Sequence, residues 1–249
     1  MKSILDHPII SARYFFPRPA PVPEPFMVRS GDVDLACIRL APHEDALTLI
    51  HFHGNGEIAG DYLGGYDHAM LGLGVNVIFA EYRGYGGSSG EPALTELLDD
   101  TKRIIEATGL SPEKIILFGR SIGSYYAIHG ASLFPDVAGL IIESGIADLG
   151  ERLLLRVDPA ELGCSRQELL DEAEKHFNHQ QKLGSYPGPV LLMHTRHDGL
   201  VDLDHAERNY QWAAGSKVLK VFEEGNHNTI IGTNARDYFQ AILDFLQRL

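Results

Sequence analysis

Six short apolar runs, separated by segments with helical spacing, constrain the fold of this 249-residue chain more than any other feature. Short, continuous apolar runs are typical of strands that are buried on both faces of a parallel sheet. The predicted strands are residues 47–53, 75–81, 114–118, 139–143, 190–194 and 218–222. The predicted helices are residues 58–71, 93–108, 121–134, 202–214 and 235–249. This order predicts a single α/β domain whose mostly parallel, doubly wound sheet has helices on both faces.

Three further segments complete this predicted domain, which spans residues 1–249. Residues 1–25, with a proline at every second position from Pro17 to Pro25, predict an extended strap over the surface. Residues 27–28 and 35–40, on either side of Ser30-Gly31-Asp32, predict an N-terminal antiparallel hairpin. Residues 149–187 carry leucines at helical spacing and predict a small helical cap, whose apolar face we expect to form a shallow pocket over the strand ends. Two helices packed on the flank of the domain are the alternative.

The pentapeptide Gly119-Arg120-Ser121-Ile122-Gly123 stands between a predicted strand and a predicted helix. At such a turn the glycines of a G-x-S-x-G sequence let strand and helix approach closely, and the serine hydroxyl is left exposed above the sheet. A chain with 26 glycines also produces such pentapeptides by chance, so an ordinary turn is the alternative. The strand before the serine and the helix after it favour a nucleophile.

Candidate partners for Ser121 follow two later strands. Asp198 comes after the run 190–194, and His227 comes after the run 218–222. The carboxyl ends of parallel strands meet at one edge of a sheet, so we expect the three side chains to lie close together. A serine hydroxyl needs an imidazole to take its proton, and the imidazole needs a carboxylate to fix its tautomer. The order serine, acid, histidine is that of serine hydrolases with this topology, so Ser121, Asp198 and His227 are the predicted catalytic residues.

Four other acidic residues compete with Asp198. Asp202 and Asp204 lie nearby, but Asp202 stands where a helix begins and favours an N-cap. Glu143 and Asp148 follow the run 139–143, a position that some hydrolases use for the acid.

His51 and His53 have a spacing that metal ligands also use. The residues that follow, Asn55-Gly56-Glu57, do not continue the pattern of a binuclear centre, so we expect no metal there. Arg120, beside the nucleophile, is expected to form an ion pair, with contact to substrate as the alternative.

The segments that carry the resemblance to a known family are His53-Gly54-Asn55-Gly56, residues 81–90, 119–123 and 194–201, and Gly225-Asn226-His227-Asn228. With these segments the chain resembles the α/β-hydrolase superfamily over about residues 28–249, and specifically its small serine esterase and acylhydrolase branch with serine-aminopeptidase-like domains. Thr195 stands where that branch usually has glycine. The resemblance implies an α/β-hydrolase fold and an oxyanion hole formed by the backbone N–H groups of Asn55 and Ile122. A neighbouring glycine in place of Asn55 is left open.

Together these features predict a serine hydrolase that cleaves a carboxylic ester or thioester of a small-molecule acyl substrate through an acyl-enzyme on Ser121. No residues build a site for a peptide amine, which favours esters over peptides, and the small cap favours short or medium acyl chains. We expect no cofactor and no metal. One alternative is a catalytically silent binding protein with the same fold, and another is a cofactor-free perhydrolase or C–C hydrolase with the same three residues.

The charge and the cysteines of the chain indicate its partners and location. A net charge of −13 argues against nucleic acid, because phosphate binding needs clustered lysine and arginine. No run is long enough to predict a membrane span, and the N-terminus lacks the features of a signal peptide. Cys37 and Cys164 are the only cysteines, which favours a reducing cytoplasm, with a disulfide as the alternative. We therefore expect a cytoplasmic protein without integral membrane association. Nothing in the sequence indicates its oligomeric state.

Overall fold

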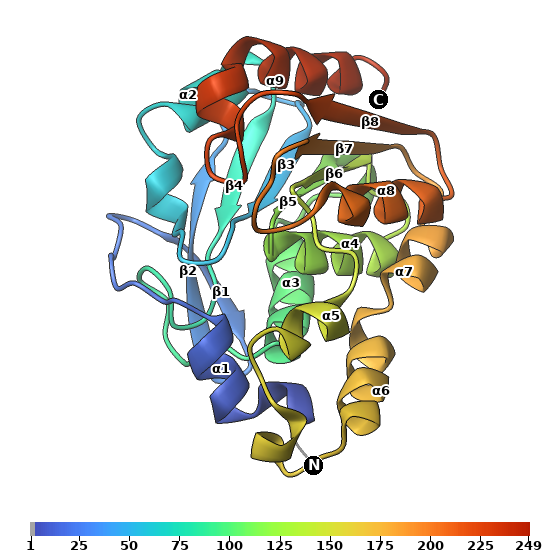
Figure 1. Ribbon diagram of the computed structural model, residues 1–249. Coiled ribbons are helices and arrows are strands. Elements are labelled where there is room, and N and C mark those ends of the chain that lie inside the picture. The colour runs from blue at the N-terminus through green and yellow to red at the C-terminus, as the bar shows by residue number, and fades with distance from the viewer. Residues whose placement is uncertain (1–2) are drawn as a thin grey trace.

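Eight strands form one sheet in the computed structural model, which describes residues 3–249 (Figure 1). They are β1 (Phe26–Ser30), β2 (Val33–Leu40), β3 (Thr48–Phe52), β4 (Asn76–Ala80), β5 (Ile115–Arg120), β6 (Gly139–Glu143), β7 (Val190–Thr195) and β8 (Lys217–Phe222). Their order in the sheet is β1-β2-β4-β3-β5-β6-β7-β8. The pairs β1–β2 and β2–β4 are antiparallel, and all the others are parallel. The predicted hairpin and the predicted mostly parallel sheet are both confirmed.

The sheet is wound in two directions from its middle. From β3 the chain passes to β4 on one side and then crosses to β5 on the other side of β3. In open α/β sheets, ligands bind outside the carboxyl ends of the strands at such a reversal. The topology therefore predicts a ligand-binding site beside the loops that follow β3 and β5.

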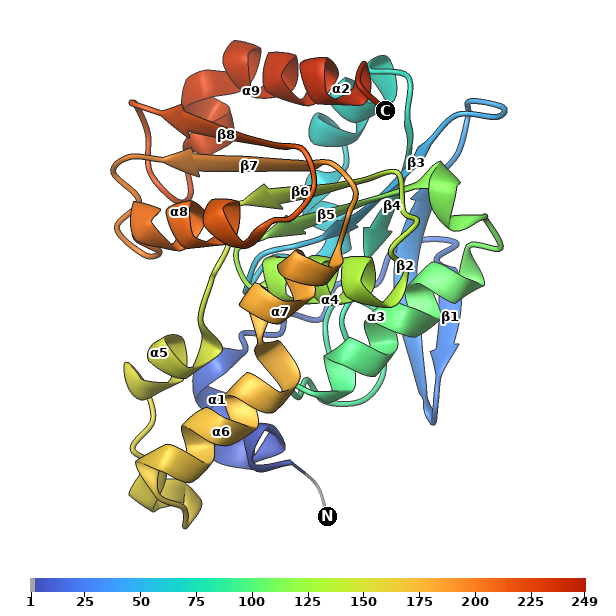
Figure 2. The same ribbon diagram turned by 90° about the vertical axis from the view of Figure 1, so that its right-hand side faces the viewer.

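Helices cover both faces of the sheet, as predicted. Figure 2 shows α2 and α9 above the sheet and α3, α4 and α8 below it. Alternate strand residues enter two separate cores: Ile50 and Leu117 belong to one, and Leu49 and Ile116 belong to the other. No helix within residues 3–249 combines the length and the apolar character that crossing a membrane requires. The bounds of these helices are α2 (Tyr66–Gly72), α3 (Glu96–Ala107), α4 (Gly123–Leu133), α8 (Leu203–Trp212) and α9 (Ile230–Leu246).

Two predicted helices differ from the observed ones. Residues 58–71 form a 3₁₀-helix (Ala59–Tyr62) and then α2, because Gly64 between them has a φ of +87°, outside the right-handed helical region. The last helix begins at Ile230 instead of residue 235, and Asn234 marks a kink inside it with a φ of −120°.

The N-terminal segment is not the extended strap that its prolines predicted. A 3₁₀-helix (Ile4–Asp6) and α1 (Pro8–Tyr14) precede the proline-rich part, which pairs with the rest of the molecule through a bridge between Pro19 and Gly86. Leu5 and Ile10 are fully buried, so this segment belongs to the core. The alternating prolines begin only at residue 17, and Pro8 stands at the start of α1, where its missing N–H breaks no helical hydrogen bond.

Residues 149–187, which we call the cap segment, are helical as predicted. They contain α5 (Leu149–Leu154), a 3₁₀-helix (Pro159–Leu162), α6 (Arg166–Phe177) and α7 (His179–Ser185). This segment contacts the N-terminal segment: Ser3 Oγ donates a hydrogen bond of 2.7 Å to Glu172, and Arg13 forms an ion pair with Glu161. Both views show α5 near α1 (Figures 1 and 2).

Candidate active site

Ser121 occupies a sharp turn between β5 and α4. Its φ is +53°, a left-handed conformation that is uncommon for a residue with a side chain. Both flanking glycines are needed for this turn: a Cβ on Gly123 would lie 2.1 Å from the carbonyl oxygen of Phe52, and a Cβ on Gly119 would lie 2.6 Å from the carbonyl oxygen of Gly123. The backbone N–H of Ser121 donates to the carbonyl of Glu143 in the neighbouring strand, at 2.8 Å. The turn is therefore held tightly against the sheet.

The side chains of Asp198 and His227 meet Ser121 at this edge of the sheet. Ser121 Oγ lies 3.0 Å from His227 Nε2, within hydrogen-bond distance. His227 Nδ1 lies 2.7 Å from Asp198 Oδ2 on its other side. The three residues come from the loops after β5, β7 and β8, as their positions at strand ends predicted. The structure thus brings together all three predicted catalytic residues.

Asp198 is buried and firmly held. Its second carboxylate oxygen, Oδ1, accepts hydrogen bonds from the backbone N–H groups of Leu200 and Val201, at 2.9 and 2.8 Å. Burial alone would raise the pKa of this carboxyl, but the hydrogen bond and charge of His227 and the two N–H donors hold it below its usual value. Asp198 is therefore ionised at neutral pH and oriented toward the imidazole.

The competing acids have other surroundings. Asp202 is exposed at the N-cap position of α8, as predicted, although its side chain makes no capping hydrogen bond. Asp204 pairs with Arg208, and Asp148 caps α5 by accepting from the N–H of Glu151. Glu143 accepts from the hydroxyl of Tyr238 at 2.6 Å. None of the four has a hydrogen bond with His227 in the part of the chain that the structure describes.

Arg120 forms ion pairs, as its position beside Ser121 predicted. Its guanidinium lies 2.9 Å from Glu57 and 3.1 Å from Glu143, and it also donates to the backbone carbonyl of His227 at 2.9 Å. Glu57 accepts in turn from the N–H of Gly54 and from the hydroxyl of Tyr62. This buried network links the loops after β3, β5 and β8, and the sequence patterns did not reveal its carboxylates.

The two residues predicted to supply the oxyanion hole lie beside Ser121. Asn55 and Ile122 both line the pocket described below. Within residues 3–249, neither backbone N–H has a hydrogen-bond partner. Two free N–H groups beside a serine hydroxyl can donate hydrogen bonds to the negative charge that develops on a carbonyl oxygen.

The two histidines considered as metal ligands are turned to different partners. His51 is buried in an aromatic cluster and stacks on Phe118 with ring centroids 4.6 Å apart. His53 lies 2.9 Å from Glu81 and 2.8 Å from the carbonyl of Gly54. Burial would lower the pKa of His53, but the hydrogen bond and charge of Glu81 raise it above its usual value. Both cysteines are free thiols.

A pocket of about 160 Å³ lies beside Ser121. The N-terminal segment contributes Tyr14 and Phe16 to its wall, although the sequence had placed no site residue there. The cap segment contributes Arg152 on α5 and Arg156 just after it. The pocket is therefore built by strand-end loops together with two segments that lie outside the sheet.

The expectation that the apolar face of the cap forms this pocket is wrong. Leu153 is fully buried in the main core, and Leu154 packs against that core. Arg152 and Arg156 are four residues apart and so lie on one side of the helical turn, which is the side toward Ser121. The leucines of α5 face the core because burying apolar area is strongly favourable.

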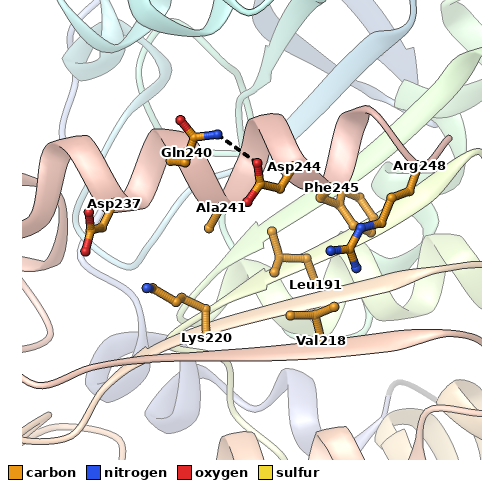
Figure 3. Close-up of a pocket in the computed structure, with 9 residues that line it drawn as sticks. All are labelled: Leu191, Val218, Lys220, Asp237, Gln240, Ala241, Asp244, Phe245 and Arg248. Carbon is orange, nitrogen blue, oxygen red and sulfur yellow. Dashed lines mark hydrogen bonds between the residues drawn. The ribbon is translucent and has the colours of Figure 1, made fainter.

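A second hollow, of about 220 Å³, lies between α9 and the amino ends of β7 and β8 (Figure 3). Leu191 and Val218 form its floor, and Lys220, Asp237 and Arg248 are at its sides. None of its nine lining residues is a serine, cysteine or histidine. It lies away from the strand ends that carry Ser121, Asp198 and His227.

Comparison with known proteins is consistent with this geometry. Residues 43–162 match the family described as serine aminopeptidase, S33. The chain is 29% identical over 195 residues to YfhR, an uncharacterized protein of Escherichia coli O157:H7, in an alignment that covers 75% of this chain and 65% of YfhR. It is also 29% identical to mouse alpha/beta hydrolase domain-containing protein 17C, with 83% and 63% covered. The chain thus spans slightly less than two thirds of either relative.

Solved structures share the fold at lower identity. An esterase of Pyrococcus furiosus, Pf2001, superposes with a TM-score of 0.72 at 21% identity and covers 93% of this chain and 98% of its own. Est1E of Butyrivibrio proteoclasticus, solved with bound ferulic acid, superposes with a TM-score of 0.75 at 16% identity and covers 90% and 98%.

Proposed function

Because this chain belongs to the α/β-hydrolase superfamily, we propose that it is a serine hydrolase that cleaves carboxylic esters or thioesters. One observation carries the proposal. Ser121 stands at a left-handed turn with its hydroxyl 3.0 Å from His227, whose other nitrogen lies 2.7 Å from the buried carboxylate of Asp198.

Ser121 Oγ attacks the carbonyl carbon of the substrate, and His227 Nε2 takes the hydroxyl proton as the new C–O bond forms. Asp198 keeps the Nδ1–H tautomer of His227 in place and stabilises the positive charge that the imidazole acquires. The carbonyl oxygen becomes an oxyanion, which accepts hydrogen bonds from the N–H groups of Asn55 and Ile122. Removing one such donor in other enzymes lowers the rate by about 10²–10³-fold.

The tetrahedral intermediate then collapses to an acyl-enzyme. The bond to the leaving group breaks, and His227 returns its proton to the departing alcohol or thiol. A water molecule gives a proton to the same imidazole and attacks the acyl carbon, and a second collapse releases the carboxylic acid and the Ser121 hydroxyl.

The charges of the pocket support an ester over a peptide with a free amino terminus. Its one carboxylate, Glu57, is already paired with Arg120. Arg152 and Arg156 would repel an ammonium group. Its volume of about 160 Å³ is also small, which favours short or medium acyl groups.

Labelling with a fluorophosphonate tests the proposal directly, because this reagent modifies only an activated serine. We expect the wild-type protein to be labelled at Ser121 and to hydrolyse p-nitrophenyl esters, most rapidly those with short or medium acyl chains. Ser121→Ala should lose both activities with little change in Tm, since it removes one oxygen atom and no core volume.

Ser132→Ala, a partly buried serine on α4, is the matched control and should keep both activities. A folded wild-type protein that neither takes up the reagent nor turns over any ester of the series would instead be a binding protein. Label retained in Ser121→Ala would place the nucleophile elsewhere.

A further inference from the structure

Two arginines of the cap segment face the reacting groups without a charged partner of their own. Arg152 and Arg156 line the same pocket as Ser121 and His227. Neither forms an ion pair within residues 3–249, whereas Arg120 in that pocket is held between Glu57 and Glu143. In a chain with a net charge of −13, arginines without a carboxylate beside them at the pocket are unexpected.

The hydrogen bonding of these two arginines is also incomplete. The Nε of Arg152 is buried and has no hydrogen-bond partner in the described part of the chain. Arg156 is exposed, and within residues 3–249 its side chain donates only to the backbone carbonyl of Arg13, at 3.2 Å; its guanidinium lies 5.7 Å from the centre of the Phe16 ring. A buried cationic donor without a partner is unfavourable, because it has lost water and gained nothing in exchange. A group from outside the chain could supply the partner that the Nε of Arg152 lacks.

We propose that Arg152 and Arg156 bind a negatively charged oxygen group, a carboxylate or a phosphate, on the substrate that Ser121 attacks. This inference rests on the proposed hydrolase function and adds the class of substrate to it. The planar guanidinium presents paired N–H donors that match the two oxygens of a carboxylate or phosphate. Because both arginines line the pocket that holds Ser121, the anionic group and the scissile carbonyl would occupy one small pocket.

The positive charges of the two arginines also act on Tyr14, which lines the same pocket. Burial raises the pKa of Tyr14, and the positive charges of Arg152 and Arg156 oppose that rise. A negative charge placed in the same space would be stabilised by the same field. The attraction acts on a part of the substrate that does not react, so it should appear mainly in KM.

The experiment compares esters that differ only in charge. For the leaving group, the acetate esters of 4-hydroxybenzoate and of 4-hydroxyphenyl phosphate are compared with the acetate ester of neutral 4-hydroxybenzamide. For the acyl group, the mono-4-nitrophenyl ester of adipic acid is compared with that of its monoamide. We expect at least one anionic ester to have a kcat/KM about tenfold or more above its neutral counterpart, as one charge-assisted hydrogen bond would give. The pair of esters that shows this preference identifies the anion as carboxylate or phosphate, and shows whether it belongs to the leaving group or to the acyl group.

Variants connect this preference to the two arginines. Arg152→Gln and Arg156→Gln should each lower kcat/KM for the anionic ester several-fold more than for its neutral counterpart, mainly through KM. Arg152→Lys and Arg156→Lys should recover part of the preference, because lysine keeps the positive charge but lacks the paired N–H donors of the guanidinium. Arg236→Gln, an exposed residue on α9, makes the same change in net charge and should leave the preference intact.

The outcomes separate this inference from the function on which it rests. Equal kcat/KM for charged and neutral esters in both arms, with Ser121 still labelled by fluorophosphonate, would overturn the anion site and leave the hydrolase proposal standing. An equal loss of preference in Arg236→Gln would also overturn it, because a general field would then be the cause. Absence of both labelling and turnover would overturn the two proposals together.

Discussion

At the scale of single residues, Asp198 uses its two carboxylate oxygens for different purposes. One oxygen accepts from the N–H groups of Leu200 and Val201, and the other faces His227. The backbone contacts hold the carboxylate in its orientation toward the imidazole. This division predicts what an amide would do at the same position.

In Asp198→Asn, the amide oxygen should remain on the two backbone N–H groups, which leaves the NH₂ group facing His227 Nδ1. The imidazole must then carry its proton on Nε2, where it cannot accept the proton of Ser121. We expect kcat for ester hydrolysis to fall by roughly 10⁴-fold, with the fold unchanged by circular dichroism.

Asp202→Asn is the control for this substitution, because Asp202 is exposed four residues further along the chain. It should change kcat little. If the two variants exchanged these results, the acid would be Asp202 and the role given to Asp198 would be wrong.

At the scale of elements, the turn between β5 and α4 depends on two missing side chains. The Cβ of an alanine at position 123 would lie 2.1 Å from a backbone oxygen of β3, which cannot move without disturbing the centre of the sheet. We expect Gly123→Ala to lower the free energy of unfolding by about 3 kcal/mol or more, or to prevent folding, as overpacking against backbone does. Soluble yield and urea denaturation measure the effect.

Gly232→Ala is the matched substitution in a helix. No atom lies within 4 Å of its added Cβ, and alanine is favoured in helices over glycine by about 0.5–1 kcal/mol. We expect it to be neutral or slightly stabilising. An undamaged Gly123→Ala protein would show that strand and helix do not approach each other as described.

The short helix α5 predicts a contrast between neighbouring leucines. Leu153 is fully buried, whereas Leu155 is 70% exposed just beyond the helix. Leu153→Ala should lower the free energy of unfolding by about 2–5 kcal/mol. Leu155→Ala should stay within about 0.5 kcal/mol of wild type.

The acyl-chain preference of both leucine variants should match that of wild type, because Arg152 of α5 and Arg156 just after it line the pocket and Leu153 does not. The p-nitrophenyl ester series provides this second measurement. A changed chain-length profile in Leu153→Ala, without loss of stability, would restore the apolar face of the cap as the wall of the acyl site.

At the scale of the whole molecule, the N-terminal segment joins the sheet domain to the cap segment. Asp6 accepts from the backbone N–H of Thr95 at the start of α3, and Ser3 and Arg13 reach Glu172 and Glu161 in the cap segment. Leu5 and Ile10 anchor this segment in the main core. Its position therefore determines how the cap segment sits beside the pocket.

Leu5→Ala should lower the free energy of unfolding by about 2–5 kcal/mol, although it lies far from Ser121 along the chain, because the leucine is fully buried. Urea denaturation measures the loss. Leu249→Ala, at a leucine that is 41% exposed, should change it by about 0.5 kcal/mol at most. A Leu5→Ala protein as stable as wild type would mean that the segment only rests on the surface.

The sequence by itself was sufficient to predict the strands of the sheet and most of the helices. It was also sufficient to predict that Ser121, Asp198 and His227 lie close together. A strand that is buried on both faces must be apolar along its whole length, so its pattern is local and readable. The ends of parallel strands meet at one edge, so the order of residues along the chain already predicts which loops come together. The glycines around Ser121 are local requirements of one turn.

Only the tertiary structure decided which face of α5 meets the pocket, that residues 4–6 and 8–14 are helical, and that Glu57 and Glu143 share Arg120. Each of these depends on contacts between residues far apart in the chain. The spacing of Leu149, Arg152, Leu153 and Arg156 shows that α5 has an apolar and a charged side, but either side could have faced the serine. The leucines are buried in the core because more apolar area is removed from water there. With the apolar side of α5 turned to the core, its charged side is left beside Ser121.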